Sequence, residues 1–261
     1  MTSRLRDQKW FQRAVVWGAL ALCWEIIGAS LGPGRFPRFS EVVIGVVAGV
    51  TNGDLVTLLG TLGQMVVGFG LAALIGIPTG LLMGRVRSVE YLLRMYFNAL
   101  FVTSLEALVP LLIVFFGMRF GFRVMVVFLF SMPYIVLNTA TGVRTVSHDL
   151  LEMAAAFCAS QRQIFVKVIL PGALPYLVAG LRLGLGSAIK GAIVAEFWVV
   201  VGTGARLIEL GENHSLAELC ALTFWIIVMV SLANRLLQLV QISLLPWSRD
   251  LIGLSGQERR E

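Results

Sequence analysis

Six long apolar runs divide this chain, and they restrict its possible folds more than any other feature. They cover residues 14–31, 57–83, 97–117, 121–142, 174–201 and 219–245. About 20 apolar residues in a helix cross the hydrocarbon core of a bilayer. Because backbone amides in lipid must be satisfied within the protein, continuous apolar runs favour helices over the alternating strands of a barrel. The sequence therefore predicts an all-α polytopic membrane protein with about six transmembrane helices.

The composition excludes a soluble globular domain. Hydrophobic residues make up 57% of the chain and charged residues only 14%, against about 45–50% and about 25% in soluble proteins. The net charge of +6 does not indicate nucleic-acid binding, because the basic residues lie between the apolar runs. The first run is read as an uncleaved span, since no small-residue cleavage site with a polar mature domain follows it.

The basic residues predict the orientation in the membrane. With six spans, one side carries the N-terminal segment, two loops and the C-terminal tail, with Arg4, Arg6, Lys9, Arg13, Arg85, Arg87, Arg94, Arg144, Arg162, Lys167, Arg249, Arg259 and Arg260. The loops on the other side carry fewer basic residues, and the last of them is acidic. An excess of Lys and Arg marks cytoplasmic loops, so both termini are predicted to be cytoplasmic.

Two shorter patterns concern packing and connection. Within the external connection 32–54, the apolar part 42–50 is too short to span, and it predicts an interfacial helix capped by Ser40. Glycines recur every four residues in the second run (Gly76, Gly80, Gly84) and in the fifth (Gly180, Gly184). Small residues at this period let helix backbones approach closely, which predicts tight packing of both spans in the bundle; the alternative is that glycine is simply common in membrane helices.

The cytoplasmic segment between the fourth and fifth runs is too long and too regular for a plain connector. Asp149 with Glu152 has the spacing of a capping box, and an alanine run follows it. Ser160 with Gln163 repeats the spacing, and Pro171 is expected to stop the second helix. Two short helices here would form a rigid projection, which a soluble partner could move; the alternative is an ordinary amphipathic surface pair.

This segment resembles the cytoplasmic loop of the transmembrane permease subunits of binding-protein-dependent ABC importers. Their pattern is Glu-Ala-Ala, three residues, Gly, nine residues, an aliphatic residue, one residue, then Leu-Pro. Here it reads Glu152-Met153-Ala154, Cys158, Val168 and Leu170-Pro171. The resemblance extends from about Leu59 to Trp247 and is closest to the nitrate, sulfonate and taurine branch. It is carried by Gly68-Phe69, Gly76-Ile77-Pro78, Ala107-Leu108-Val109-Pro110-Leu111, Phe116-Gly117, Leu137-Asn138-Thr139, Gly180-Leu181-Arg182 and Ala195-Glu196.

The resemblance implies a type I ABC importer permease fold with a cytoplasmic coupling helix. It divides the chain into residues 1–54 (N-terminal tail, first span and external connection), a permease core over 55–247 with coupling helices near 149–170, and a cytoplasmic tail over 248–261. The departures Met153 and Cys158 bear on how sharply the chain bends after the first short helix. The residues it assigns to contact with an ATPase are Glu152, Met153, Ala154, Ala155, Cys158, Ser160, Arg162, Leu170 and Pro171.

The resemblance also implies the partners. They are a second permease copy in a homodimer, two ABC ATPase subunits, an external solute-binding protein and the lipid of a bacterial inner membrane, with no nucleic acid. The chain itself has no G-x-x-x-x-G-K-[ST] loop, so ATP and Mg²⁺ are expected to be used by the partner ATPase, with no cofactor in this chain. We therefore expect a transport subunit and not an enzyme.

Polar residues inside the runs are candidates for the solute pathway, because a charge in a span costs about 2.5–3.5 kcal/mol on insertion scales. Glu25 and Arg182 are charged as well, but Arg182 can reach the cytoplasmic end. The alternative for each candidate is an interhelical hydrogen bond or ion pair that locks the bundle. The pathway candidates are Glu106, Asn138, Thr139, Lys190 and Glu196.

No catalytic or metal-binding constellation is expected. His148 and His214 are the only histidines, and neither has acidic or cysteine partners at ligand spacing, so a surface or capping role is predicted. Cys23, Cys158 and Cys220 lie far apart and are interpreted as small apolar packing residues. The acidic residues are scattered over different spans, which disfavours a membrane-embedded enzyme.

The sequence is compatible with several classes of solute. The branch implies a small anion such as nitrate, a sulfonate or taurine, while similar permeases carry pyrimidine vitamin precursors or other heterocycles. A secondary transporter driven by an ion gradient is a further alternative. Such a protein is expected to show broken helices in two related halves, and no repeat of that kind is found in the sequence.

Overall fold

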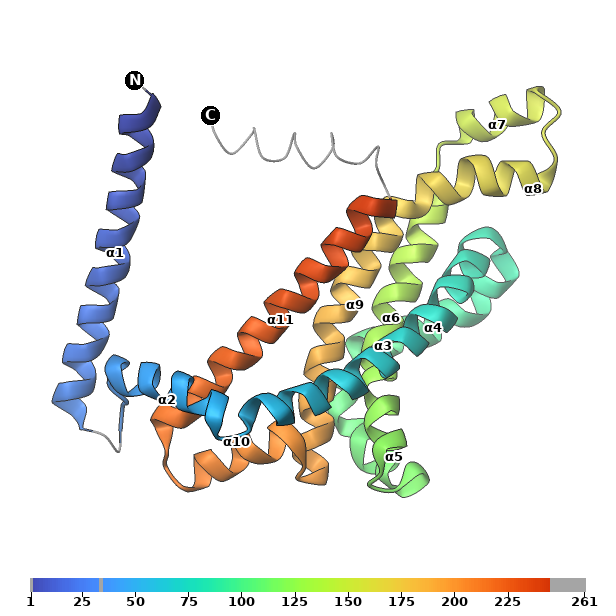
Figure 1. Ribbon diagram of the computed structural model, residues 1–261. Coiled ribbons are helices and arrows are strands. Elements are labelled where there is room, and N and C mark those ends of the chain that lie inside the picture. The colour runs from blue at the N-terminus through green and yellow to red at the C-terminus, as the bar shows by residue number, and fades with distance from the viewer. Residues whose placement is uncertain (1, 33–34, 245–261) are drawn as a thin grey trace. The chain divides into compact units, whose positions relative to one another are not determined.

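The computed structural model describes residues 2–32 and 35–244, and every regular element assigned within them is helical. This confirms the all-α class. The predicted tail 248–261, with Arg249, Arg259 and Arg260, lies outside the described residues. The elements (Figure 1) are α1 (Thr2–Leu31), α2 (Phe39–Thr51), α3 (Asp54–Arg85), α4 (Arg87–Val102), η1 (Leu105–Leu108), α5 (Val109–Phe116), α6 (Phe120–Arg144), α7 (His148–Ala156), α8 (Gln161–Ile164), η2 (Phe165–Ile169), α9 (Leu170–Val199), α10 (Gly202–Glu212) and α11 (Leu216–Leu244).

Four helical segments are long and apolar enough to cross a membrane: α3, α6, the continuous segment Gln161–Val199, and α11 over Leu216–Leu239. They correspond to the predicted second, fourth, fifth and sixth runs. The first run lies in α1, whose apolar part Val15–Leu31 is shorter than these. By length and composition alone, the described residues hold four spans, or five if one bent pair counts as a span, against the six or so predicted.

The predicted third run, residues 97–117, is not one straight helix. The chain leaves α4 at Thr103, makes the 3₁₀ turn η1, and bends by 100° before α5. Pro110 offers a physical reason, because proline lacks an N–H and its ring clashes with the carbonyl four residues earlier, here that of Glu106. A continuous helix through this region is therefore disfavoured, and polar residues gather at the break.

The chain divides into two compact units, and the first contains the residues up to Leu59 together with Val201–Met229. Within it, Glu25 of α1 reaches the start of α2, where its carboxylate accepts bonds from the Ser40 backbone N–H (3.0 Å) and hydroxyl (2.9 Å). The helix expected at 42–50 is confirmed as α2, and its interfacial position stays a prediction. Its cap was misassigned, because Arg38 is the N-cap and Ser40 is the second residue of the helix.

A second feature of this unit, α10, was not predicted. Positive φ angles at Val200 (53°) and Gly202 (65°) end α9 and redirect the chain. Arg206 then lies near the carboxylates of Glu209 (2.9 Å), Asp54 (3.5 Å) and Glu218 (3.6 Å). The hydrogen bond from Arg206 to Glu209, with the neighbouring charges, raises the pKa of the guanidinium above its ordinary value. The acidic loop expected on this side is therefore partly neutralised by its own arginine.

In the second unit, Gly60–Val200 with the chain from Val230 onward, helix α6 is the central element. The α3 glycines face it: a methyl group at Gly80 would lie 2.7 Å from the Thr139 Cβ, and one at Gly84 would lie 2.5 Å from the Val143 Cβ. The α9 glycines face it too, since Gly180 lies against Asn138 and Gly184 against Ile135. The predicted close packing of both spans is confirmed, and α6 is their shared partner.

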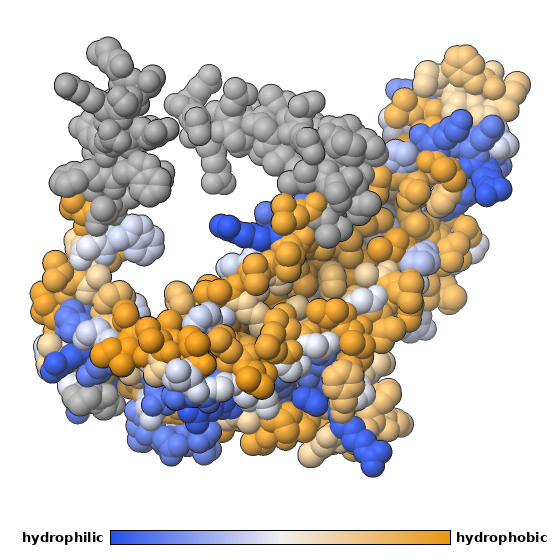
Figure 2. Space-filling model, viewed as in Figure 1, coloured by the Kyte–Doolittle hydropathy of each residue, from blue (hydrophilic) through white to orange (hydrophobic). Residues whose placement is uncertain are grey.

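The exposed surface is mostly apolar, the reverse of a soluble protein. Figure 2 shows orange side chains over much of the visible face, and Trp17, Leu74, Val114 and Ile227 are among the large exposed hydrophobic residues. Soluble monomers rarely expose contiguous apolar areas of this extent. The surface is that of a chain surrounded by lipid or by partner subunits.

Gly80→Val is expected to destabilise the bundle by about 1–3 kcal/mol through overpacking. The added carbons would meet the Val136 carbonyl oxygen at 2.8 Å as well as Thr139, and backbone cannot move aside as a flexible side chain can. The measurement is thermal unfolding of the purified protein in detergent. Gly70→Val is the matched control, because no atom lies within 4 Å of a methyl group at Gly70. Equal melting temperatures for the two variants would show that the α3–α6 contact is not tight.

Candidate functional site

Helix α7 begins the segment that the sequence singles out. Its N-cap is Ser147, whose hydroxyl accepts a bond from the Leu150 N–H at 3.4 Å. The expected capping box of Asp149 with Glu152 is therefore wrong: Asp149 lies in the first turn of the helix. The Glu152 carboxylate instead pairs with His148 Nδ1 at 3.0 Å, four residues back on the exposed side. Both side chains are available to a partner.

The turn after α7 shows what the cysteine at the family's glycine position does. Cys158 has a positive φ of 54°, in the left-handed region that glycine adopts most readily. Its N–H bonds to the Ala155 carbonyl at 2.9 Å, and the Ala159 N–H bonds to the Ala154 carbonyl at 3.1 Å. These two bonds form a Schellman motif, so the sharp turn is kept despite the substitution. Cys158 is exposed, and its interpretation as a buried packing residue is wrong.

Beyond the turn, the chain enters one continuous helical segment. The predicted capping box is confirmed: Ser160 Oγ accepts from the Gln163 N–H, and the Gln163 side chain accepts from the Ser160 N–H. Pro171 does not stop the helix, contrary to expectation. It lies in the first turn of α9, and the π-helical segment η2 directly before it gives the backbone a different hydrogen-bond pattern there. The helix from Gln161 to Val199 is thus unbroken over 39 residues.

The length of this segment has a mechanical consequence. At 1.5 Å per residue, 39 residues have a total length along the helix axis of about 58 Å, nearly twice the hydrocarbon thickness of about 30 Å, and Figure 1 shows that the segment bends between α8 and α9. The segment is therefore longer than one span requires. Figure 1 shows α7 and α8 extending beyond the ends of α6 and α9. We call this projection, residues 147–164, the knob.

The knob exposes an apolar ridge. Leu150, Met153 and Phe157 recur at helical spacing and are 46%, 53% and 80% exposed. Sequence reasoning selected Met153 but missed Leu150 and Phe157, although the spacing of three and four residues was a readable signal. Ala154, by contrast, is 9% exposed and lies on the inner side of α7. The ridge is the part of the knob suited to a hydrophobic groove on another protein.

The other residues assigned to the ATPase contact fall into two groups. Ala155, Ser160 and Arg162 are exposed on the knob with Glu152 and Met153, whereas Leu170 and Pro171 are half-buried at the start of α9. Arg85, at the end of α3, holds the base of the knob: its guanidinium donates to Gln161 Oε1 at 3.2 Å and stacks over the Phe165 ring at 5.1 Å. The knob is therefore attached to α3 as well as to α6 and α9.

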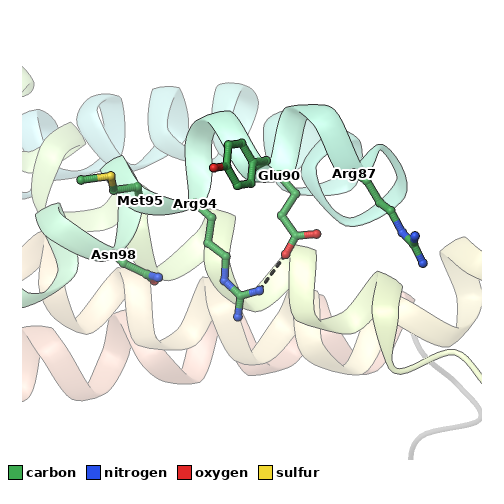
Figure 3. Close-up of a pocket in the computed structure, with 6 residues that line it drawn as sticks. Arg87, Glu90, Arg94, Met95 and Asn98 are labelled. Carbon is green, nitrogen blue, oxygen red and sulfur yellow. Dashed lines mark hydrogen bonds and ion pairs between the residues drawn. The ribbon is translucent and has the colours of Figure 1, made fainter.

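A series of polar cavities lies beside α4. The first is lined by Arg87, Glu90, Arg94, Met95 and Asn98. Figure 3 shows Glu90 turned toward Arg94. Glu90 also forms an ion pair with Arg144 of α6, which donates to the Met83 carbonyl. A second cavity, of about 140 Å³, is lined by Asn98, Thr141 and Arg144 among others. At this end of α4, Glu90 is thus paired with both Arg94 and Arg144.

A third cavity, of about 160 Å³, brings together two of the predicted pathway residues. Glu106 from η1 and Lys190 from α9 both line it, with hydroxyl groups from the α4–η1 break and from Ser187. The two residues are far apart in the sequence, and their meeting depends on the 100° bend between α4 and α5. The rings of Phe101 and Tyr134 also line it, tilted by 58° to one another with centroids 4.9 Å apart.

The remaining pathway candidates take packing positions. Glu196 is fully buried, and its Oε1 accepts from Thr61 Oγ1 at 2.7 Å and Gln64 Nε2 at 2.6 Å, joining α9 to α3. Thr139 is buried against Gly80. Asn138 packs against Gly180 and donates to the Tyr134 carbonyl at 2.7 Å. The Glu196 bonds agree with the alternative of an interhelical hydrogen bond that locks the bundle. The Asn138 bond stays within α6, and the buried Thr139 hydroxyl has no hydrogen-bond partner among the described residues. Over residues 2–32 and 35–244, no group of three or more His, Cys, Asp or Glu residues could hold a metal ion.

A comparison with known protein families identifies the family of this chain. Residues 76–249 match the family described as the binding-protein-dependent transport system inner membrane component. The chain belongs to this family of permeases. Its members are membrane subunits of ABC importers, which work with an ATPase and a solute-binding protein. Membership excludes the alternative of a secondary transporter driven by an ion gradient.

Individual permeases of known or assigned solute are similar to this chain. The bicarbonate transport system permease protein CmpB of Synechocystis sp. is 29% identical over 180 residues, 68% of this chain and 64% of that protein. The CmpB of Synechococcus elongatus is 28% identical over 233 residues, 84% of each chain. The taurine transport system permease protein TauC of Escherichia coli is 28% identical over 195 residues, 74% of this chain and 71% of that protein.

Proposed function

We propose that this permease forms the translocation pathway of an ATP-driven importer and works as a homodimer with two ATPase subunits. The observation that carries the proposal is the apolar ridge of the knob, Leu150, Met153 and Phe157, at the end of a helix continuous with α9. An exposed ridge outside the lipid costs free energy unless a partner covers it. A groove on a cytoplasmic ATPase is the partner that fits, and both termini then lie in the cytoplasm.

The mechanism is a transfer of motion through a stiff element. ATP and Mg²⁺ bind to the ATPase partners, and closure of those subunits moves the two knobs. Since α8, η2 and α9 are one helical segment, a displaced knob moves α9. The glycine contacts hold α3 and α9 against α6, so these helices move as a packed group. The pathway would then open alternately to each side.

The dimer follows from two physical arguments. One chain supplies one knob, whereas a motor of two ATPases needs two. Glu106 and Lys190 are also exposed in a single chain, and lipid around them would solvate neither charge. A second copy of the chain facing this region would replace lipid with protein and water. The pathway is then the polar region between the two copies.

The solute is proposed to be a small anion of the bicarbonate, nitrate, sulfonate or taurine kind. The named relatives carry bicarbonate and taurine. Lys190 in the third cavity would attract such a group. An external solute-binding protein would deliver it to the side opposite the knob.

Glu152→Arg tests the coupling role. Reversing an exposed charge on the knob is expected to reduce solute uptake severalfold while the ATPase continues to turn over, because the knob no longer follows its partner. The assay uses proteoliposomes with the permease, its ATPase and its binding protein, and it compares solute taken up with ATP hydrolysed.

Glu212→Arg is the matched control, because Glu212 is an exposed glutamate at the end of α10, far from the knob in sequence. The purified chain alone is expected to show no ATPase activity. Undiminished uptake by Glu152→Arg, with normal coupling, would contradict the assignment.

A further inference from the structure

The third cavity offers two opposite charges to a bound molecule. Lys190 and Glu106 both line it, together with Thr103, Ser104 and Ser187. From the geometry we propose that this cavity is a binding station for a small zwitterion, a molecule with an oxoanion at one end and an amine at the other. The inference rests on the proposed function and narrows the class of solute.

The availability of these charges distinguishes this cavity from the ones at the other end of α4. There Glu90 is already paired with Arg94 and Arg144. In contrast, Lys190 and Glu106 form no ion pair with one another or with any other residue in the described part of the chain, although they share one cavity. A pair serving only to neutralise the bundle is expected to be in contact, as the Glu90 pairs are. The space between the two charges is instead left for a third group.

The position of Lys190 within the long apolar helix α9 is a reason for its charge to need a partner. Lys190 lies nine residues before Val199, the end of α9, which places it about 14 Å along the helix from that end. That is close to half of the hydrocarbon thickness of about 30 Å. An ammonium or carboxylate at this depth is rare unless it pairs with another group or lines a watery path. A zwitterion would pair with both at once.

The remaining lining fits the shape of such a molecule. Hydroxyl groups of Thr103, Ser104 and Ser187 can donate to an oxoanion, and they accompany Lys190 in the cavity. Phe101 and Tyr134 form an apolar wall that suits a short carbon spacer. The volume of about 160 Å³ has room for a small solute but not for a large one.

The carboxylate of Glu106 is the reason to expect a zwitterion and not a simple anion as the bound molecule. A cavity built for an anion alone gains from Lys190 and loses from a carboxylate beside it, because like charges repel in a low-dielectric setting. An amine on the solute changes that repulsion into attraction. The acid would therefore select against anions that lack an amine, as specificity often depends on a repulsive group.

The test measures binding of three probes to the full permease–ATPase complex in lipid nanodiscs, without binding protein. The probes are taurine, ethanesulfonate, which lacks the amine, and ethylamine, which lacks the sulfonate. Saturation-transfer NMR and calorimetry give the dissociation constants. We expect taurine to bind at least tenfold more tightly than either of the other two.

The variants assign the two ends of the probe. Glu106→Gln is expected to remove most of the preference for taurine over ethanesulfonate, and Lys190→Met to weaken both sulfonates at least tenfold. Glu212→Gln and Lys167→Met are the matched controls, since these exposed residues lie outside the cavity. Both controls should bind taurine as the unaltered protein does.

Every other outcome overturns the inference. Taurine that fails to bind, or binds no more tightly than ethanesulfonate, would show that the cavity does not select a zwitterion. Recovery of normal behaviour in the double variant Lys190→Met/Glu106→Gln would show that the two residues only balance each other. ATP-driven uptake, measured separately, tests the proposed function. If uptake depends on ATP but binding does not favour taurine, only the inference is wrong. If uptake by the unaltered complex does not depend on ATP, the proposed function is wrong.

Discussion

Replacing Phe157 by aspartate is expected to lower transport more than tenfold while the chain still inserts and folds. Phe157 is 80% exposed at the end of α7, so the substitution removes nothing from the core. Aromatic residues at the centre of an interface commonly contribute about 2–4 kcal/mol to binding, and about 1.4 kcal/mol corresponds to a tenfold change in affinity. A charge in the same groove adds a desolvation cost. The ATPase should therefore no longer stay attached to the permease.

The measurement is copurification of the ATPase with the permease, followed by uptake in proteoliposomes. Phe157→Leu is the control, because leucine keeps an apolar side chain at the same position of the ridge. It is expected to retain most of the activity. Stable copurification and normal uptake with Phe157→Asp would mean that the ridge is not the docking surface, and Leu150 and Met153 would then need another explanation.

Glu196→Leu is expected to destabilise the bundle by about 1–3 kcal/mol for each buried donor that loses its acceptor. The leucine deletes the oxygen that accepts from Thr61 and Gln64 and leaves two donors in an apolar interior. The measurement is the melting temperature in detergent. Glu196→Gln should be much milder, because its amide oxygen can accept both bonds.

This pair of variants separates the two interpretations of Glu196. If the residue locks α9 to α3, stability and transport fall together in Glu196→Leu. If both variants melt normally and transport is still lost, Glu196 acts in the pathway and the locking interpretation is wrong. Glu212→Leu is a useful reference for an acidic residue on the surface, since Glu212 is exposed at the end of α10.

Several local features of the site could be read from residue type and spacing. Ser160 and Gln163 form the expected capping box because its donors and acceptors lie within one helical turn. The cap of α7 was misplaced by two residues, since Ser147 and Asp149 are both good caps and the spacing to Glu152 favoured the wrong one. The prediction that Pro171 ends a helix was wrong for a related reason. Proline is tolerated in the first turn of a helix, and the local sequence does not show that a helix begins at Leu170.

The sequence by itself determined that the chain is helical, that it belongs in a membrane and that a knob lies between α6 and α9. These properties depend on the length of the apolar runs and on contacts within a few residues. Both can be read from the sequence, because the hydrocarbon core of a bilayer has a known thickness and requires backbone hydrogen bonds to be made within the chain. Only the tertiary structure decided that Glu106 and Lys190 line one cavity and that Glu196 bonds to Thr61 and Gln64. Such pairs join residues separated by 84 to 135 positions, and they form because α6 and its glycine contacts bring separate helices together. The glycine spacing indicates which spans pack closely, but the spacing of residues along one chain does not indicate which polar side chains come together across helices.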